Sequence, residues 1–137
     1  MSAAAAKPAW TVAVGLGSCG VAAGAQALFQ RAQERLDPAA AALVKTGCAG
    51  LCYLEPMLEL YDPAGRRFTY VQLTPDLVDR IVTEHIGRGA PVEALLLTGP
   101  DRAADTGRFL GKQKKIVLEN CGLIDPESLE ASLAAHG

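Results

Sequence analysis

Apolar positions along the chain follow two periods, and each predicts a different kind of element. Short apolar runs that are rich in β-forming residues and bounded by turn residues predict strands. These runs span residues 10–16, 41–45, 56–61 and 67–73. The last two are joined by the sequence Asp-Pro-Ala-Gly at 62–65, in which proline fixes φ and glycine permits a left-handed backbone. We therefore expect those two strands to form an antiparallel hairpin.

Apolar positions spaced by three and four residues predict helices. The first helix is expected over 21–36, where alanine, leucine and phenylalanine alternate with charged and amide side chains until Asp-Pro follows. The sequence Thr-Pro-Asp at 74–76 starts a second helix, because it combines a cap, a first-turn proline and an acid. Gly87 and Gly89 are expected to end it. Similar cap and proline chemistry starts a short last helix over 129–135.

The predicted order of elements is β-α-β-β-β-α, followed by a tail. This order suits an α/β domain with one mixed sheet flanked by helices. We expect a flexible leader at residues 1–9, the domain at 10–98, and a linker and connecting segment at 99–137. Thioredoxin-like domains share the pattern, but periodicity alone does not name that fold.

The composition of the chain excludes some classes of function. The chain has 137 residues, of which half are apolar and one fifth charged, which is typical of a packed globular protein. A net charge of −2 and only 5% aromatic residues argue against a nucleic-acid partner. No apolar run is long enough for membrane insertion, so we expect a cytoplasmic protein. The uncharged stretch 8–30 also permits a secretory signal, but a strand, loop and helix explain the same stretch.

The four cysteines are the most informative residues. Cys19 follows the first predicted strand, Cys48 and Cys52 follow the second, and Cys121 is remote. Side chains at the same ends of neighbouring strands can meet. Four interpretations stay open: an iron–sulfur site, a structural zinc site, a redox pair and ordinary free cysteines. Zinc sites usually have two close cysteine pairs, and redox pairs usually have two intervening residues rather than the three found here.

Other ionisable residues carry weaker signals. His85 lies near a helix end and is expected at the surface or as a cap rather than as a metal ligand, and His136 lies beside the chain end. Solvated positions are expected for the acids around the hairpin and for the lysine run: Glu55, Glu59, Asp62, Lys112, Lys114 and Lys115. Glycines 15, 17 and 20 match a dinucleotide-binding motif, but only Asp37 offers the acid that such a site needs. We interpret that match as coincidence.

Two segments, 14–25 (VGLGSCGVAAGA) and 44–52 (VKTGCAGLC), resemble the thioredoxin-like [2Fe–2S] ferredoxin domain. More narrowly, they are similar to that domain at the N-terminus of the NADH-binding flavoprotein subunit. Such subunits occur in complex I-type dehydrogenases, in NAD-linked or electron-bifurcating hydrogenases, and in formate dehydrogenases. The segment 112–128 is similar to the one that leads into the flavin domain of those subunits.

The resemblance implies a thioredoxin-like fold and an electron-transfer role beside a flavoprotein, NADH-binding domain or subunit. It also implies a [2Fe–2S] cluster on Cys19, Cys48 and Cys52. Cluster-bearing relatives have Cys-x4-Cys in the first loop, and their first cysteine falls here on Val14, which cannot bind iron. Either another group, such as Cys121, completes the ligand set, or the domain is a cluster-free docking module. The flavin and NADH domain would begin where the sequence ends, so we expect no complete active site in it.

Overall fold

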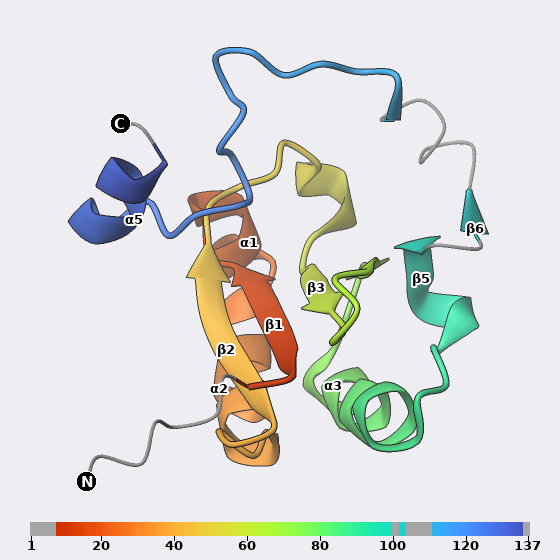
Figure 1. Cartoon of the computed structure of the whole chain (residues 1–137). Helices are drawn as coiled ribbons and strands as arrows, with labels where there is room; N and C mark the ends of the chain where they lie inside the picture. The colour runs from red at the N-terminus through yellow and green to blue at the C-terminus, as the bar shows by residue number, and fades with distance from the viewer. Residues whose placement is uncertain (1–7, 100–101, 104–110, 136–137) are drawn as a thin grey trace, which may run out of the picture.

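The chain folds around one mixed six-stranded sheet. The computed structural model describes residues 8–99, 102–103 and 111–135 (Figure 1). The strands are β1 (Trp10–Gly15), β2 (Ala41–Thr46), β3 (Leu58–Tyr61), β4 (Arg67–Tyr70), β5 (Leu96–Gly99) and β6 (Arg102–Ala103). Their order is β2-β1-β3-β4-β5-β6, with β1 parallel to β2 and every other pair antiparallel. The predicted α/β fold with a mixed sheet is confirmed.

Helices follow β1, β4 and the C-terminal loop. They are α1 (Ser18–Ala22), α2 (Ala25–Arg35), α3 (Pro75–Ile81), which continues as the π-helical turn η2 (Val82–Ile86), and α5 (Leu129–Ala134). Single 3-10 turns are η1 (Cys52–Leu54) and η3 (Glu93–Leu95). The one helix predicted over 21–36 is in fact two, because Gly24 adopts a φ of 104° between them. Among the described residues no helix is both long and apolar enough to cross a lipid bilayer.

The predicted end of one helix needs correction, and two strands were not predicted. The helix that starts at Pro75 passes through Gly87 and ends at Gly89, which has a φ of 70°. There the backbone N–H of Ala90 donates to the carbonyl of Glu84, a pattern that satisfies the last turn. Strands β5 and β6 were not expected from the sequence, because their residues, Leu-Leu-Thr-Gly and Arg-Ala, show no period of two. Most of the predicted linker at 99–111 lies outside the described residues.

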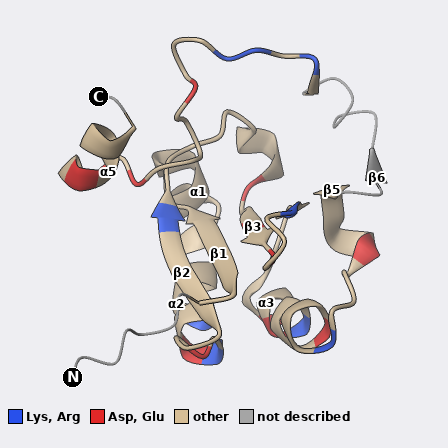
Figure 2. Cartoon of the chain, in the orientation of Figure 1, with Lys and Arg blue, Asp and Glu red and all other residues tan. Residues whose placement is uncertain are grey.

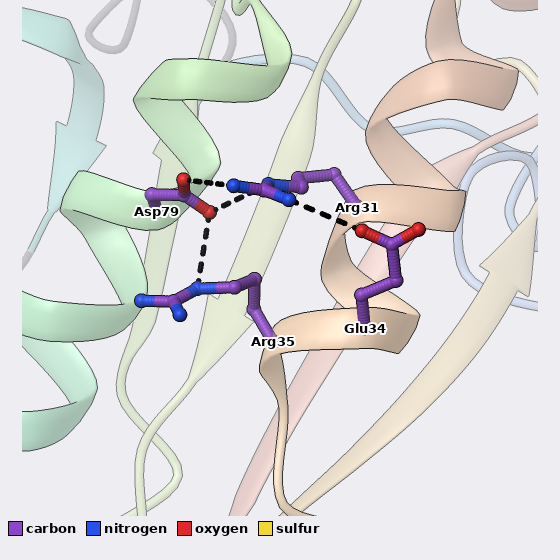
Figure 3. A network of polar contacts seen from close by, with 4 residues as sticks. All are labelled: Arg31, Glu34, Arg35 and Asp79. Atoms are coloured by element: carbon purple, nitrogen blue, oxygen red, sulfur yellow. Dashed lines mark hydrogen bonds and ion pairs between the residues drawn. The ribbon is translucent and has the colours of Figure 1, made fainter.

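One face of the sheet forms the core against α2 and α3 (Figure 1). The largest fully buried side chains there are Val12, Val14, Leu28, Leu58, Leu60, Tyr70, Val78 and Ile81. A network of ion pairs joins the two helices outside this core (Figure 3). Arg31 donates from Nε and Nη2 to the two carboxylate oxygens of Asp79 at 2.9 and 2.6 Å, and Arg35 Nε lies 3.2 Å from Oδ1. These ion pairs therefore hold α2 and α3 together where they pack against the sheet.

Replacing Asp79 by asparagine is expected to lower the stability of the fold. The Arg31 guanidinium holds the pKa of Asp79 below its ordinary value of 3.8. The ionised, paired form therefore contributes stability above that pH, and the contribution is lost as the pH falls further. Urea unfolding at neutral pH should show an earlier midpoint for D79N, with a smaller difference at high salt. E84Q, which breaks only the ion pair between Arg80 and Glu84 within one helix, should shift the midpoint less; equal shifts would contradict this view.

His85 belongs to the core, so the expectation of a surface or cap position is wrong. Its side chain is 2% exposed, and its Nδ1 lies 2.7 Å from the hydroxyl of Tyr70. The same hydroxyl accepts the backbone N–H of Val92 at 3.1 Å. The rings of Trp10 and Phe68 meet the imidazole edge-on. A histidine near a helix end is expected to be exposed, but side chains of β1 and β4 surround this one.

The stability of the domain is expected to fall as the pH drops below about 6.5, because burial lowers the pKa of His85 below its ordinary 6.5. The folded chain keeps the imidazole neutral while the unfolded chain binds a proton, so stability is complete above that pH and decreases below it. Urea unfolding at about pH 7.5 and about pH 5.5 measures the change. H85L should be less stable at both values yet lose most of the difference between them. An undiminished difference in H85L would assign it to other groups.

Candidate metal centre

Three of the four cysteines meet at one edge of the sheet. Because β1 and β2 are parallel, the loops that follow them leave from the same edge. Cys19 lies in α1, Cys48 in the loop after β2, and Cys52 at the start of η1. The Sγ atoms of Cys19 and Cys48 are 3.3 Å apart and those of Cys48 and Cys52 are 3.5 Å apart. All three sulfur atoms lie within 4.8 Å of one another, an arrangement that suits metal ligation.

Glycines let the two cysteine loops approach each other. A β-carbon at Gly17 would lie 3.0 Å from the β-carbon of Cys48. One at Gly20 would lie only 2.4 Å from the carbonyl oxygen of Gly15. The glycines that match a dinucleotide motif are thus explained by close backbone packing around the thiols.

Hydrogen bonds lower the pKa of the Cys48 thiol and raise that of Cys19. The backbone N–H of Gly50 donates to its sulfur at 3.3 Å, and the Cys19 thiol also donates to it, so its pKa falls below the ordinary value. The pKa of Cys19 rises to about 12, chiefly through its hydrogen bond with Cys48. Between these two thiols the proton is therefore held on Cys19, and Cys48 becomes a thiolate, the form that binds metal, more readily than Cys19 does.

The two positions considered for a fourth ligand do not join this cluster. Val14 is 0% exposed and packs in the core with the helices, so its side chain points away from the thiols. Cys121 is half-buried and is not part of the group of sulfur atoms within 4.8 Å. The three thiols thus supply part of a four-ligand set.

The C-terminal segment packs on the loop that carries Cys48 (Figure 1). Lys115 Nζ donates to the carbonyl of Ala49 at 3.0 Å, and the N–H of Gly47 donates to the carbonyl of Ile124 at 3.2 Å. Gly122, at a φ of 80°, lies so close to Ala49 that a β-carbon on it would be 2.8 Å from the Ala49 side chain. Because these contacts join residues far apart in the sequence, no local sequence pattern predicts them.

Three acids lie just before or within the β3–β4 hairpin, and the expected solvated position is wrong for two of them. Glu59 and Asp62 are each 7% exposed, and they pair with Arg67 and Arg66 respectively. Glu55 is half-buried; its Oε2 accepts the N–H of Met57 at 2.9 Å, and burial raises the pKa of its carboxyl. Side chains alternate between the two faces of β3, so Glu59 lies on the face opposite Leu58 and Leu60. The sequence predicts that this face is solvated, but in the structure Glu59 is buried and lines a cleft that the C-terminal segment also lines.

A cleft of about 820 Å³ opens beside the cysteine loop. Its walls come from strands β3 to β5, from Ala49 and Leu51, and from the segment after residue 110. The charged residues that line it are Glu59, Arg66, Arg67, Lys114, Lys115 and Glu119. Figure 2 shows the lysines as a basic stretch along the C-terminal segment. Cations outnumber anions in this lining, so the cleft favours an acidic occupant or partner.

Known proteins are similar to this chain in sequence and in fold. No family model matches the sequence. A ferredoxin described as "Ferredoxin, 2Fe-2S" from Aquifex aeolicus (strain VF5) is 34% identical over 87 residues, which cover 60% of this chain and 75% of that protein. A crystal structure of the wild-type thioredoxin-like [2Fe–2S] ferredoxin from Aquifex aeolicus matches with a TM-score of 0.59 at 28% identity, covering 67% of this chain and 99% of the other. A second structure of a ferredoxin of that description, also from Aquifex aeolicus, matches with a TM-score of 0.61 at 25% identity, over 70% and 96% of the two chains.

The donor set fits the group that these relatives are named for. Thiolates are the usual protein ligands of iron–sulfur clusters, and the site presents three of them with a backbone N–H directed at one sulfur. Glycines at the loop leave backbone close to the sulfur atoms, as such clusters require. On sequence and fold together, the chain belongs to the thioredoxin-like [2Fe–2S] ferredoxins.

Proposed function

We propose that this domain carries a [2Fe–2S] cluster on Cys19, Cys48 and Cys52 and transfers single electrons. The observation that carries the proposal is the convergence of three thiols within 4.8 Å, in a chain of this family. When bound, the cluster supplies one-electron redox chemistry. The protein holds the thiolates, lowers the pKa of Cys48 and keeps backbone close to the sulfur atoms.

We further propose that the domain serves a cytoplasmic NADH-linked flavoprotein oxidoreductase. The resemblance of residues 112–128 to the segment before a flavin domain supports this, with the ferredoxin domain at 10–98 and a connecting segment at 99–137. The connecting segment also exposes a run of apolar side chains, Ile116, Val117 and Leu118, next to three lysines. Exposed apolar side chains rimmed by charge favour a protein partner.

The first experiment measures iron, acid-labile sulfide and the visible spectrum of protein purified without air. We expect about two irons and two sulfides per chain, and absorption that dithionite bleaches. A chain that stays colourless after anaerobic cluster reconstitution would overturn the cluster assignment.

The second experiment tests the partner. NADH alone should leave the loaded chain oxidised, whereas NADH with a catalytic amount of a complex I-type NADH-binding flavoprotein should bleach it. K114E, in the cleft beside the cysteine loop, should slow this reduction, and the slowing should depend on salt. The exposed, remote R88E serves as the matched control and should reduce at the original rate. Equal rates for both variants would exclude the cleft from docking.

A cluster-free docking module is the second candidate function, and the burial of Val14 in the core favours it. Such a module would bind the flavoprotein without iron. Iron content together with a binding measurement on the same preparation separates the two functions.

A further inference from the structure

The cluster proposed above needs one more protein ligand than the three thiols. Iron–sulfur clusters of the [2Fe–2S] type take four ligands from the protein. Val14 points into the core, and Cys121 is outside the thiol group. No other cysteine, histidine or acid of the described residues belongs to that group either, so the candidates for a fourth donor are the side chains next to it, near the ends of β1 and β2.

Glu55 lies at that place. It follows Cys52 by three residues, and its carboxylate lies between the end of β1 and helix α1. Its Oε1 lies 3.4 Å from the point that a β-carbon on Gly15 would occupy, at the end of β1. Its Oε2 lies 3.3 Å from the corresponding point on Gly20, in the helix that carries Cys19. The carboxylate thus takes the space into which a side chain from the last residue of β1 would point.

No cation of the described residues pairs with the Glu55 carboxylate. Glu59 and Asp62, the two buried acids of the β3–β4 hairpin, each pair with an arginine. Within residues 8–99, 102–103 and 111–135, Glu55 forms no ion pair, and its Oε1 forms no hydrogen bond. A partly buried carboxylate is costly unless it is paired or coordinates a metal. Its free oxygen, Oε1, lies at the end of β1, the edge of the sheet from which the loops with Cys19 and Cys48 leave.

We propose that Glu55 is the fourth ligand of the cluster, binding iron through its carboxylate where relatives use a cysteine. This inference rests on the proposed function and specifies its ligand set as three thiolates and one carboxylate. Glu55, like Cys121, lies outside the group of three thiols, and a cluster with two irons would not require all four of its ligands to meet at one point. Oxygen is a harder ligand than sulfur, and the substitution is therefore visible in the spectra of the iron.

The test compares the full chain with E55Q and E55C after anaerobic reconstitution with ferrous iron and sulfide. Glutamine keeps the size of the side chain and the acceptor for the Met57 N–H, but it has no charge. We expect E55Q to fold like the parent and to retain about tenfold less iron, because even substitutions outside the ligand shell cost metal sites that much. E55C should keep the full iron content and show shifted EPR g-values and visible bands, as an all-thiolate cluster requires. Circular dichroism and urea unfolding of the iron-free chains verify that all three are folded.

Each outcome decides between the two proposals. E55Q with full iron and the EPR spectrum of the parent would overturn Glu55 as ligand while leaving the cluster in place. E55C with unchanged g-values would do the same. A parent chain that binds no iron would overturn the proposed function and the carboxylate ligand together. C121S should load fully and keep the parent spectrum, and loss of iron in this variant would assign the fourth ligand to Cys121 instead.

Discussion

Replacing Cys48 by serine is expected to leave the chain colourless and to lower its iron content by about tenfold or more. Cys48 occupies the centre of the thiol group, with the sulfur atoms of Cys19 and Cys52 at 3.3 and 3.5 Å. It is also the thiol whose pKa is lowered, by the N–H of Gly50. Serine retains a similar shape but stays protonated at neutral pH and offers a poor ligand for iron. Iron and sulfide per chain, with the visible spectrum, measure the loss.

The same variant separates the electron carrier from the docking module. Serine at this loop position disturbs little of the surface, so C48S should bind the flavoprotein with the affinity of the parent while it fails to accept electrons. C121S is the matched control, because Cys121 lies outside the thiol group, and it should keep both iron and electron transfer. Full colour in C48S would remove Cys48 from the ligand set and require a different site.

The strands that carry the site could be predicted because local chemistry determines them. Proline and glycine in the turn at 62–65 define the β3–β4 hairpin, and the β-forming run at the start defines β1. Two parallel strands ending at one edge then bring Cys19 and Cys48 together, as their loop positions suggested. The ligand cysteines could be proposed because each follows a strand rather than lying inside an apolar run.

The rest of the site depends on contacts that no local pattern encodes. The sequence predicts a solvated Glu55, but in the structure its carboxylate lies beside Gly15 and Gly20. His85 lies in the core because its imidazole hydrogen-bonds to Tyr70 and packs against the rings of Trp10 and Phe68. The tail likewise covers the face of β3 that holds Glu59, through contacts at Ala49 made by residues far along the chain. Tertiary burial, rather than residue type, decides the role of each of these groups.

Replacing Gly20 by alanine is expected to destabilise the domain and to empty its metal site together. The added β-carbon would lie 2.4 Å from the carbonyl oxygen of Gly15, and backbone cannot yield as a flexible side chain can. Overpacking of this kind costs about 1–3 kcal/mol, and here the strain moves α1 away from the end of β1. Because Cys19 is the neighbour of Gly20 in α1, its thiol moves away from Cys48 as well. We therefore expect an earlier urea midpoint and less iron per chain.

G87A is the matched control for this experiment. Gly87 lies in the helix after η2 with ordinary helical dihedral angles, and a β-carbon there would meet only the carbonyl oxygen of Val82, at 3.5 Å. Alanine is the better helix former by roughly 0.5–1 kcal/mol, so G87A should be as stable as the parent or more so, with full iron. If G20A matched G87A in both midpoint and iron content, the close contact between α1 and β1 would not be what positions Cys19. Loss of iron in G20A at an unchanged midpoint would instead show that the contact serves the site more than the fold.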